Sequence, residues 1–291
     1  MNRVNILHFN GSKIVSMKTF ISLLLCCFLV VTALAEDGVM NLENLRVLVY
    51  TKNGKGYVHE NIPYAVKCIQ KLGEQYGFKT DVSENPTLFT EENLKQYSII
   101  IFASTNNDVF DTDDQRLAFR HFIEVGGAFV GLHSVVGTER NWTWFKMMLG
   151  GTFAWHPKFQ KYRIQVIDPD HPSVLGLPKV WEKEDECYFQ KEVDPGIHTV
   201  LAHDLSSLDT LGQSKIKSNA GSFTSYYPAA WYQQFDGGTI WITALGHDKK
   251  DYEDPIYSRH VLQGIEFVAS QLKSKDYSKA YSKSKEEPMH Y

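Results

Sequence analysis

Histidines follow several of the segments that the sequence predicts to be strands. His59 lies in the loop after the first apolar run, His133 follows the run Ala128–Leu132, and His247 follows a later one. Parallel strands end at the same edge of an α/β sheet, where ligands bind, so these three imidazoles are expected to share one crevice. His156, which comes after a pair of glycines, can supply a fourth imidazole.

Two imidazoles and one carboxylate can hold a catalytic divalent metal while leaving a position for water or substrate. His133, Glu186 and His247 are the expected ligands, and zinc is the first candidate ion. His156 or Asp185 would then transfer a proton. No local motif such as HExxH is present, so the site depends on the fold bringing distant residues together. Without a metal, the same groups can act as acid and base, since histidine titrates near neutral pH.

Each of these residues also has a purely structural interpretation. His133 can be a neutral core histidine, His59 a surface loop residue and His156 a turn residue. The acidic run Glu182–Glu186 can be a solvated charged face. Ser134 beside a histidine invites comparison with serine hydrolases, but the G-x-S-x-G elbow of those enzymes is absent.

The composition favours a small polar ligand over nucleic acid. A net charge of -4 without a basic stripe cannot neutralise a phosphate backbone. Aromatic side chains are frequent and can offer flat apolar faces to sugar rings, although most such residues lie in cores. The expected contacts with a sugar substrate are His59, Trp142, Trp155, Tyr188 and Trp231. The sequence leaves the oligomeric state open.

The first half of the chain alternates strand and helix patterns, which predicts a parallel sheet with helices on both faces. Apolar runs mark the strands, and apolar residues at helical spacing mark the helices. The expected strands are 46–50, 78–82, 98–102 and 128–132, and the expected helices are 60–77 and 112–125.

After Pro157 the pattern changes to strands with little helix between them. These strands either extend the sheet or form an antiparallel flap. Gly237-Gly238 is a hairpin turn signal between two of them. The expected strands are 162–167, 199–202, 229–235 and 239–245, followed by a closing helix over 257–272.

The two ends of the sequence differ from the domain expected over 45–272. Residues 17–35 predict a signal peptide, because Lys18 precedes an apolar run too short to span a bilayer and Ala33-Leu34-Ala35 suits cleavage. Residues 1–16 are then an extension without a clear role. The mature protein is expected to be exported, periplasmic or secreted, with no stable membrane span.

Two further features concern the mature chain. The tail 273–291 lacks periodicity and is expected to be disordered. Cleavage of the signal peptide leaves Cys68 and Cys187, which could pair in an oxidising compartment. A disulfide is the less favoured alternative, because Cys68 lies near the apolar face of its predicted helix.

Several motifs, taken together and in order, resemble the ThuA-like, or trehalose-utilisation, family. The matching elements are the His59 loop, GGAFVGLHS at 126–134, LGGTFAWHP at 149–157, DHPSVLGLP at 170–178, DECY at 185–188 and ALGHDKKDYEDP at 244–255. They cover nearly the whole mature chain. The resemblance implies a class I glutamine amidotransferase-like fold, with His133 standing where the amidotransferases carry their cysteine. Without a thiol there, glutaminase chemistry is not expected.

The resemblance also implies a substrate class. The family is associated with trehalose and related disaccharides, alongside sugar 3-dehydrogenases, which implies chemistry on 3-keto-glycosides. Cys187 departs from the family pattern, which often has a larger, frequently aromatic residue in the DE-x-Y segment, and this departure leaves the exact sugar open.

The sequence therefore predicts an α/β fold with a flavodoxin-like or amidotransferase-like parallel sheet and extra strands in the C-terminal half. The expected function is an exported enzyme that acts on oxidised (3-keto) glycosides as a hydrolase, lyase or isomerase. The alternative is a non-catalytic carbohydrate-binding protein, which needs aromatic platforms but no convergent ionisable groups.

Overall fold

The computed structural model describes Met1 and residues 42–209 and 213–290. The expected signal peptide, and all of the expected extension except Met1, lie outside the described residues. Within the described part of the chain, no helix is both long enough and apolar enough to cross a bilayer.

A nine-stranded sheet organises the domain, in the order β2-β1-β3-β4-β11-β10-β9-β6-β7. The first five of these strands are mutually parallel, as the alternation of strand and helix patterns predicts. They are β1 (Arg46–Tyr50), β2 (Lys79–Ser83), β3 (Ile99–Ala103), β4 (Ala128–Leu132) and β11 (Gly238–Thr243). The helices between them include α2 (Ile62–Tyr76), α3 (Glu91–Leu94) and α4 (Asp113–Glu124).

Local sequence signals fix where these helices begin and end. Helix α4 starts with a capping box, in which Thr112 and Gln115 satisfy each other's backbone N–H groups. Helix α2 ends at Gly77, whose φ of 90° lies in the left-handed region that glycine adopts without steric cost. Both helices fall inside the ranges that the periodicity predicts.

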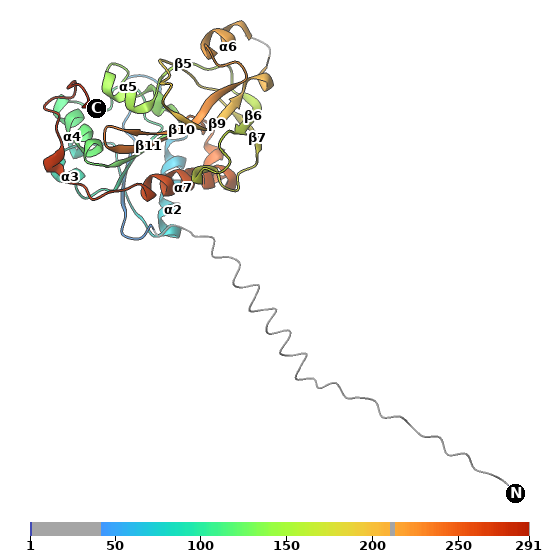
Figure 1. Cartoon of the computed structure of the whole chain (residues 1–291), viewed down its shortest axis with the longest axis horizontal. Coiled ribbons are helices and arrows are strands. Elements are labelled where there is room, and N and C mark those ends of the chain that lie inside the picture. The colour runs from blue at the N-terminus through green and yellow to red at the C-terminus, as the bar shows by residue number, and fades with distance from the viewer. Residues whose placement is uncertain (2–41, 210–212, 291) are drawn as a thin grey trace. The chain divides into compact units, whose positions relative to one another are not determined.

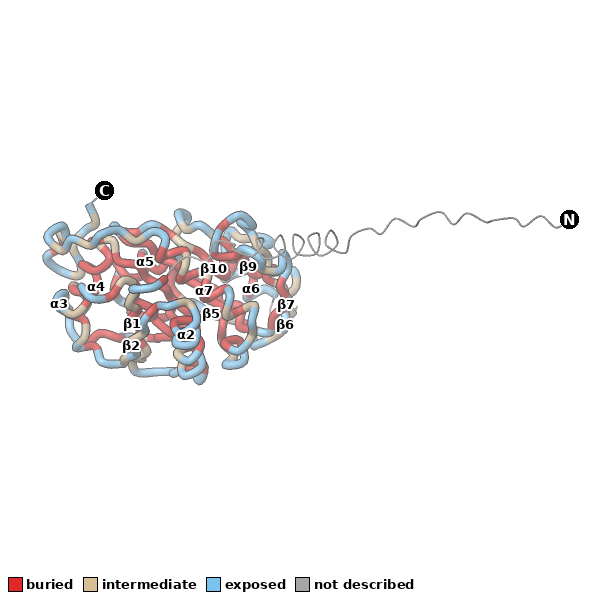
Figure 2. Tube along the Cα trace, turned by 90° about the horizontal axis from the view of Figure 1, so that it is seen from below, coloured by how far each residue is buried: buried red, intermediate tan, exposed pale blue. Residues whose placement is uncertain are grey.

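Helices cover both faces of the parallel strands. Side chains alternate along β4, so Phe129 packs toward α4 and Val130 faces the opposite side. On that side lies Trp241, the partner of Val130 on β11, which contacts the last long helix, Pro255–Ser270. Helices α2 and α7 (Pro255–Ser270) lie together below the sheet in Figure 1, and α4 and α5 (Thr143–Leu149) lie above it. The buried residues follow the sheet through the interior (Figure 2).

The four strands expected after Pro157 all join the nine-stranded sheet, so they adopt the first of the two alternatives and not the separate flap. Strands β10 (Tyr226–Phe235), β9 (His198–Asp204), β6 (Gln160–Val166) and β7 (Val180–Asp185) extend the sheet with antiparallel pairing. Strands β5 (Thr152–Trp155) and β8 (Phe189–Lys191) form a separate two-stranded sheet. Helix α6 (Gln213–Ala220) packs near β8. The β10–β11 turn is Asp236-Gly237, both at positive φ as a type I′ turn requires.

Residues 273–290 do not behave as the disordered tail that their composition predicts. Carbonyls of Lys285 and Glu287 accept hydrogen bonds from the buried Arg120 guanidinium, and the Lys285 carbonyl also accepts from Trp142. The Tyr281 hydroxyl donates to Asp236 over 2.7 Å. The lack of periodicity did not reveal these contacts, because many of them use backbone groups, which every residue type carries.

Candidate functional site

Four side chains from distant parts of the chain converge at the carboxyl edge of the parallel strands. Each of His59, His133, Glu186 and His247 offers one potential ligand atom, and these four atoms lie within 4.8 Å of one another. The strand-end argument predicts this convergence for the three histidines. The fourth member, Glu186, arrives from the segment between β7 and β8.

His133 stands on a sharp turn at the end of β4. Its φ of 49° is unusual for a residue with a side chain, and it begins a 3-10 turn over His133–Gly137. Its Nδ1 lies 3.2 Å from the Ala244 carbonyl, which can only accept, so Nδ1 carries the proton. Nε2 is therefore left with a lone pair, 3.2 Å from the Tyr188 hydroxyl. The turn thus presents an unprotonated nitrogen to the cluster.

His247 and Glu186 form an ion pair beside His133. The His247 Nδ1 lies 3.0 Å from the Glu186 Oε2 and 3.3 Å from the His133 Nε2. Burial is the largest single influence and lowers the pKa of His247, but the hydrogen bond that its ring donates to Glu186 and the nearby negative charges, first that of Glu186, together raise the pKa above its usual value. Burial lowers the pKa of His133 far below its usual range, so this imidazole is neutral.

His59 joins the cluster from the loop before α2. Its Nε2 lies 3.3 Å from the Tyr188 hydroxyl, and its ring packs edge-on against His133 at 4.7 Å. Burial lowers the pKa of His59 to about 4. Among the described residues its buried Nδ1 has no hydrogen-bond partner. His59, which was expected to contact the substrate, lies among the potential metal ligands.

Asp185 holds the His247 loop and does not face the cavity. Its carboxylate accepts hydrogen bonds from the backbone N–H groups of Gly246 at 2.8 Å, His247 at 3.1 Å and Glu186 at 2.9 Å. It is fully buried and also pairs with Lys183 over 3.3 Å. Asp185, expected as one of two candidates for proton transfer, thus lies where both of its oxygens accept hydrogen bonds from the backbone.

A cavity of about 600 Å³ opens beside the cluster. His156 lines it, with Nδ1 2.7 Å from the Pro157 carbonyl and 3.5 Å from the Glu186 Oε1. Its ring stacks on Tyr188, so His156 sits where a proton could be exchanged with a bound ligand. The other lining residues are Lys55, Gly56, Tyr57, His59, Asn106, Asn107, Arg140, Phe153, Glu186, Tyr188 and His247.

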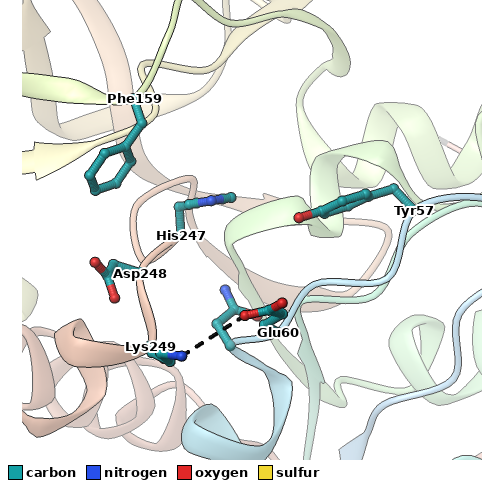
Figure 3. Close-up of a pocket in the computed structure, with 7 residues that line it drawn as sticks. Tyr57, Glu60, Phe159, His247, Asp248 and Lys249 are labelled. Atoms are coloured by element: carbon teal, nitrogen blue, oxygen red, sulfur yellow. Dashed lines mark ion pairs between the residues drawn. The ribbon is translucent and has the colours of Figure 1, made fainter.

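A second, smaller cavity of about 270 Å³ shares Tyr57 and His247 with the first. In the view of Figure 3, His247 lies between Tyr57 and Phe159, and the Phe159 ring is 5.7 Å from that of His247. Glu60 and Lys249 form an ion pair at the rim. The His247 side chain therefore borders both cavities.

The three tryptophans expected to hold sugar do not line either cavity. Trp142 and Trp231 are buried in the core, where the Trp231 indole N–H donates to the Leu149 carbonyl over 2.9 Å. Trp155 stacks on Phe189 at 5.8 Å instead of facing the site. Large aromatic residues suit cores as well as sugar sites, and their spacing did not separate the two.

The aromatic walls of the larger cavity are Tyr57, Phe153 and Tyr188. Only Tyr188 was expected. Phe153 precedes a register shift in the pairing of β5 with β8, so residue alternation along β5 gave no guide to its direction. Tyr57, which is 61% exposed, lies two residues before His59, and that proximity is the signal that could have found it.

Comparison with known proteins identifies the family. The model of the ThuA family, described as trehalose utilisation, matches residues 46–268. The chain belongs to the ThuA family. This membership indicates a carbohydrate-related role. No curated protein sequence matches the chain.

Solved structures agree with this family on the fold. A ThuA-like protein from Bacteroides uniformis superposes with a TM-score of 0.66 at 22% identity, covering 83% of this chain and 98% of its own. A ThuA-like protein from Parabacteroides merdae gives 0.59 at 15% identity, covering 80% and 93%. A cytoplasmic protein from Salmonella typhimurium gives 0.52 at 12% identity, covering 77% and 98%. At these identities the likeness concerns the fold alone.

Proposed function

We propose that this ThuA-family chain is an exported enzyme that acts on oxidised (3-keto) glycosides with the help of a divalent metal. The convergence of His59, His133, Glu186 and His247 beside a cavity of about 600 Å³ is the observation that supports this proposal most. Cavities of this size hold small ligands. A protein that only binds sugar has no need of four convergent ionisable groups, so the cluster favours the enzyme.

The donor set fits a divalent ion such as zinc. Tetrahedral ligands about 2.0–2.1 Å from an ion lie about 3.3 Å from one another. The His247 Nδ1 is 3.3 Å from the His133 Nε2 and 3.0 Å from the Glu186 Oε2, while the latter two atoms are 4.0 Å apart. The proton fixed on the His133 Nδ1 leaves Nε2 free to ligate. His59 contributes either a fourth ligand or a contact to the substrate.

When bound, the metal would supply Lewis acidity at a developing oxyanion. A ketone at C3 acidifies the C2 proton, which an ordinary glycoside does not offer to a side-chain base. His156 lines the cavity and stacks on Tyr188, so its ring is placed to take that proton from a bound ligand. The electrons of the C2–H bond pass into the C2–C3 enediolate. Collapse of the enediolate restores the C3 carbonyl, forms a C1–C2 double bond and breaks the C1–O bond, and the departing alkoxide takes a proton. Alternatively, the enediolate takes a proton at C3, and the carbonyl moves from C3 to C2.

The substrate prediction is that the purified protein transforms a 3-keto-glucoside or 3-keto-disaccharide and leaves the unoxidised glycoside unchanged. His133→Ala should lower the rate by on the order of 10²–10³, as loss of an oxyanion stabiliser does. Product formation followed by NMR measures both effects. Equal activity on oxidised and unoxidised sugars, or no turnover across a broad panel of keto-sugars, would favour the binding-protein alternative.

The metal prediction is that the protein purified from metal-supplemented medium carries a stoichiometric divalent ion, measured by mass spectrometry of the metal content. His133→Ala and His247→Ala should lose most of it, because each removes a ligand. His198→Ala, which changes an exposed histidine on β9, is the matched control and should retain the ion. Metal content unchanged in both site variants would reject the metal centre.

A further inference from the structure

A half-buried guanidinium in the larger cavity has no anionic partner. Arg140 lines this cavity, and no carboxylate of the described residues forms an ion pair with it. The neighbouring Glu139 is engaged elsewhere, with its Oε2 2.8 Å from the Nε of Arg116. Burial lowers the pKa of Arg140, and no protein carboxylate offsets the burial. Charges removed from water are normally paired, so an unpaired one in a cavity calls for an explanation.

The protein holds Arg140 by one edge of its guanidinium. The Nε donates to the Gly137 carbonyl over 2.8 Å, and the Nη2 donates to the Asn106 Oδ1 over 3.1 Å. These two donors share the side-on edge of the planar fork. The end-on edge, which carries Nη1 and the second proton of Nη2, remains available. That edge matches the two oxygens of a carboxylate in a bidentate pair.

The two groups that hold the Arg140 guanidinium, at Asn106 and Gly137, are themselves held in place. The Asn106 side chain is oriented by a second contact, from its Nδ2 to the Tyr57 carbonyl at 3.2 Å. At Gly137, a Cβ atom would lie 2.5 Å from the Asn106 Oδ1 and 2.8 Å from the Arg140 Nη2. Only glycine therefore lets the three groups approach this closely. The guanidinium is pre-organised before any ligand arrives, which lowers the entropic cost of binding one.

A chain of ring contacts links Arg140 to the histidine cluster. Its Cζ lies 5.4 Å from the centroid of the Phe153 ring, the Phe153 ring is 4.6 Å from Tyr188, and Tyr188 is 4.6 Å from His133. Two aromatic rings thus connect the guanidinium with the imidazoles along the wall of one cavity. A sugar ring lying over these aromatic faces would place its reacting carbons near the cluster and one substituent near Arg140.

The charges that line the cavity favour a negative substituent. Lys55 adds a second cation to the wall, while Glu186, the carboxylate of that lining, is paired with His247 at 3.0 Å. A cation–π contact with Phe153 alone would stabilise Arg140 without the oriented Asn106 and would leave the end-on edge without a role.

We propose that the end-on edge of Arg140 binds a carboxylate carried by the sugar ligand, so that the site prefers acidic sugars such as hexuronides over neutral ones. This inference rests on the proposed function only in taking the ligand to be a sugar. A phosphorylated sugar offers related chemistry, but its tetrahedral oxygens fit the planar fork less closely than a carboxylate does.

The test compares ligands that differ in one group. Isothermal titration calorimetry of the full-length mature protein should give a Kd for methyl β-glucuronide at least about tenfold below that for methyl β-glucoside, as a charge-assisted pair predicts. Glucose 6-phosphate should bind less tightly than the glucuronide. In Arg140→Gln the preference for the glucuronide over the glucoside should disappear. Arg140→Lys should retain only part of it, because a lysine cannot form the bidentate pair.

Lys146→Gln, which removes one positive charge away from the cavity, is the matched control and should keep the preference. Unchanged circular dichroism and thermal midpoint show that the Arg140 variants fold. Equal binding of glucuronide and glucoside, no glucuronide binding at millimolar concentration, tighter binding of glucose 6-phosphate, or a preference that survives Arg140→Gln would each overturn the inference. If the protein turns over neutral keto-glucosides but does not prefer acidic sugars, only the inference about Arg140 is wrong. If it prefers acidic sugars through Arg140 but turns over no keto-sugar, only the proposed reaction is wrong.

Discussion

His203 and His260 are buried imidazoles that lie outside the cavities. His203 is fully buried on β9, and neither of its ring nitrogens has a partner among the described residues. His260 packs against Trp241, with the ring centroids 4.8 Å apart and the planes tilted. Burial lowers the pKa of His203 to about 4 and that of His260 to about 3. Both therefore stay neutral in the folded protein while the unfolded chain can take up protons.

For single residues, we predict that the free energy of unfolding decreases as the pH is lowered and that His203→Gln makes this decrease smaller. The folded pKa of His203 is depressed from 6.5 to about 4, so its contribution is present above pH 6.5 and is lost as pH falls toward 4. The loss for this residue is on the order of 3 kcal/mol. Urea unfolding at several pH values measures it. The exposed His198→Gln control should keep the wild-type slope, and an identical slope in His203→Gln would contradict the prediction.

The sequence could indicate a site residue only where the order of the strands places that residue directly. His133 and His247 follow adjacent parallel strands, with Leu132 opposite Thr243, so strand ends alone brought them together. Trp142 and Trp231 could not be placed in this way, because burial depends on which helix or strand covers them. Arg140 was missed, since a single arginine in a loop has no pattern that distinguishes it from a solvated one.

Among the elements, the loop after β11 positions His247 through its backbone. Gly246 has a φ of 103°, and a Cβ there would collide with the Tyr257 hydroxyl. Its carbonyl accepts from the Asn61 Nδ2 at 2.6 Å, and its N–H donates to Asp185 at 2.8 Å. Helix α2, strand β7 and this loop are thereby fixed to one another at the edge of the site.

We predict that Asp185→Asn weakens the metal affinity of the cluster about 10–100-fold, as loss of an outer-shell partner does, without removing any ligand. The amide puts a donor where the carboxylate accepts from the backbone at two points of the His247 loop. Competition with a chelator measures the affinity. Asp204→Asn, which changes an acid paired with Arg163 away from the cluster, is the matched control. Unchanged affinity in Asp185→Asn would reduce Asp185 to a packing role.

The inner parallel strands were predictable because they are largely apolar, and β3 is buried at every position, whereas the edge strand β2 is mostly polar. Strand β7 was missed, since its charges resembled a solvated run. Its burial in fact alternates, with Trp181, Lys183 and Asp185 inside, but two of these three are charged, so no hydrophobic alternation marks the strand in the sequence. Buried Lys183 and Asp185 compensate each other, which composition alone cannot show. Strands β5 and β8 are four and three residues long, too short for a pattern.

For the whole molecule, the described domain is independent of a disulfide. Cys68 and Cys187 are both free and buried, which settles the alternative that the sequence left open. The first described strand begins at Arg46, so removal of a leader ending at Ala35 would leave every described element intact.

We predict that the protein from its native host is exported and begins at Glu36, because cleavage after Ala33-Leu34-Ala35 suits a signal peptidase. N-terminal sequencing of the secreted or periplasmic fraction measures it. Ala35→Gln, which removes the small residue at the cleavage site, should leave a longer, unprocessed chain. A mature protein that still begins at Met1 or Met17 would contradict the prediction.

The backbone at His133 has an evolutionary consequence. A side chain held at a φ of 49° costs on the order of 1–2 kcal/mol, which glycine avoids and asparagine partly avoids. Selection must therefore maintain the imidazole at this position, because glycine or asparagine would adopt the turn with less strain. A duplicated gene copy freed from the need for this histidine would drift toward glycine or asparagine at position 133 while its sheet and helices persisted. The residue at this one position would then separate active copies from inactive ones.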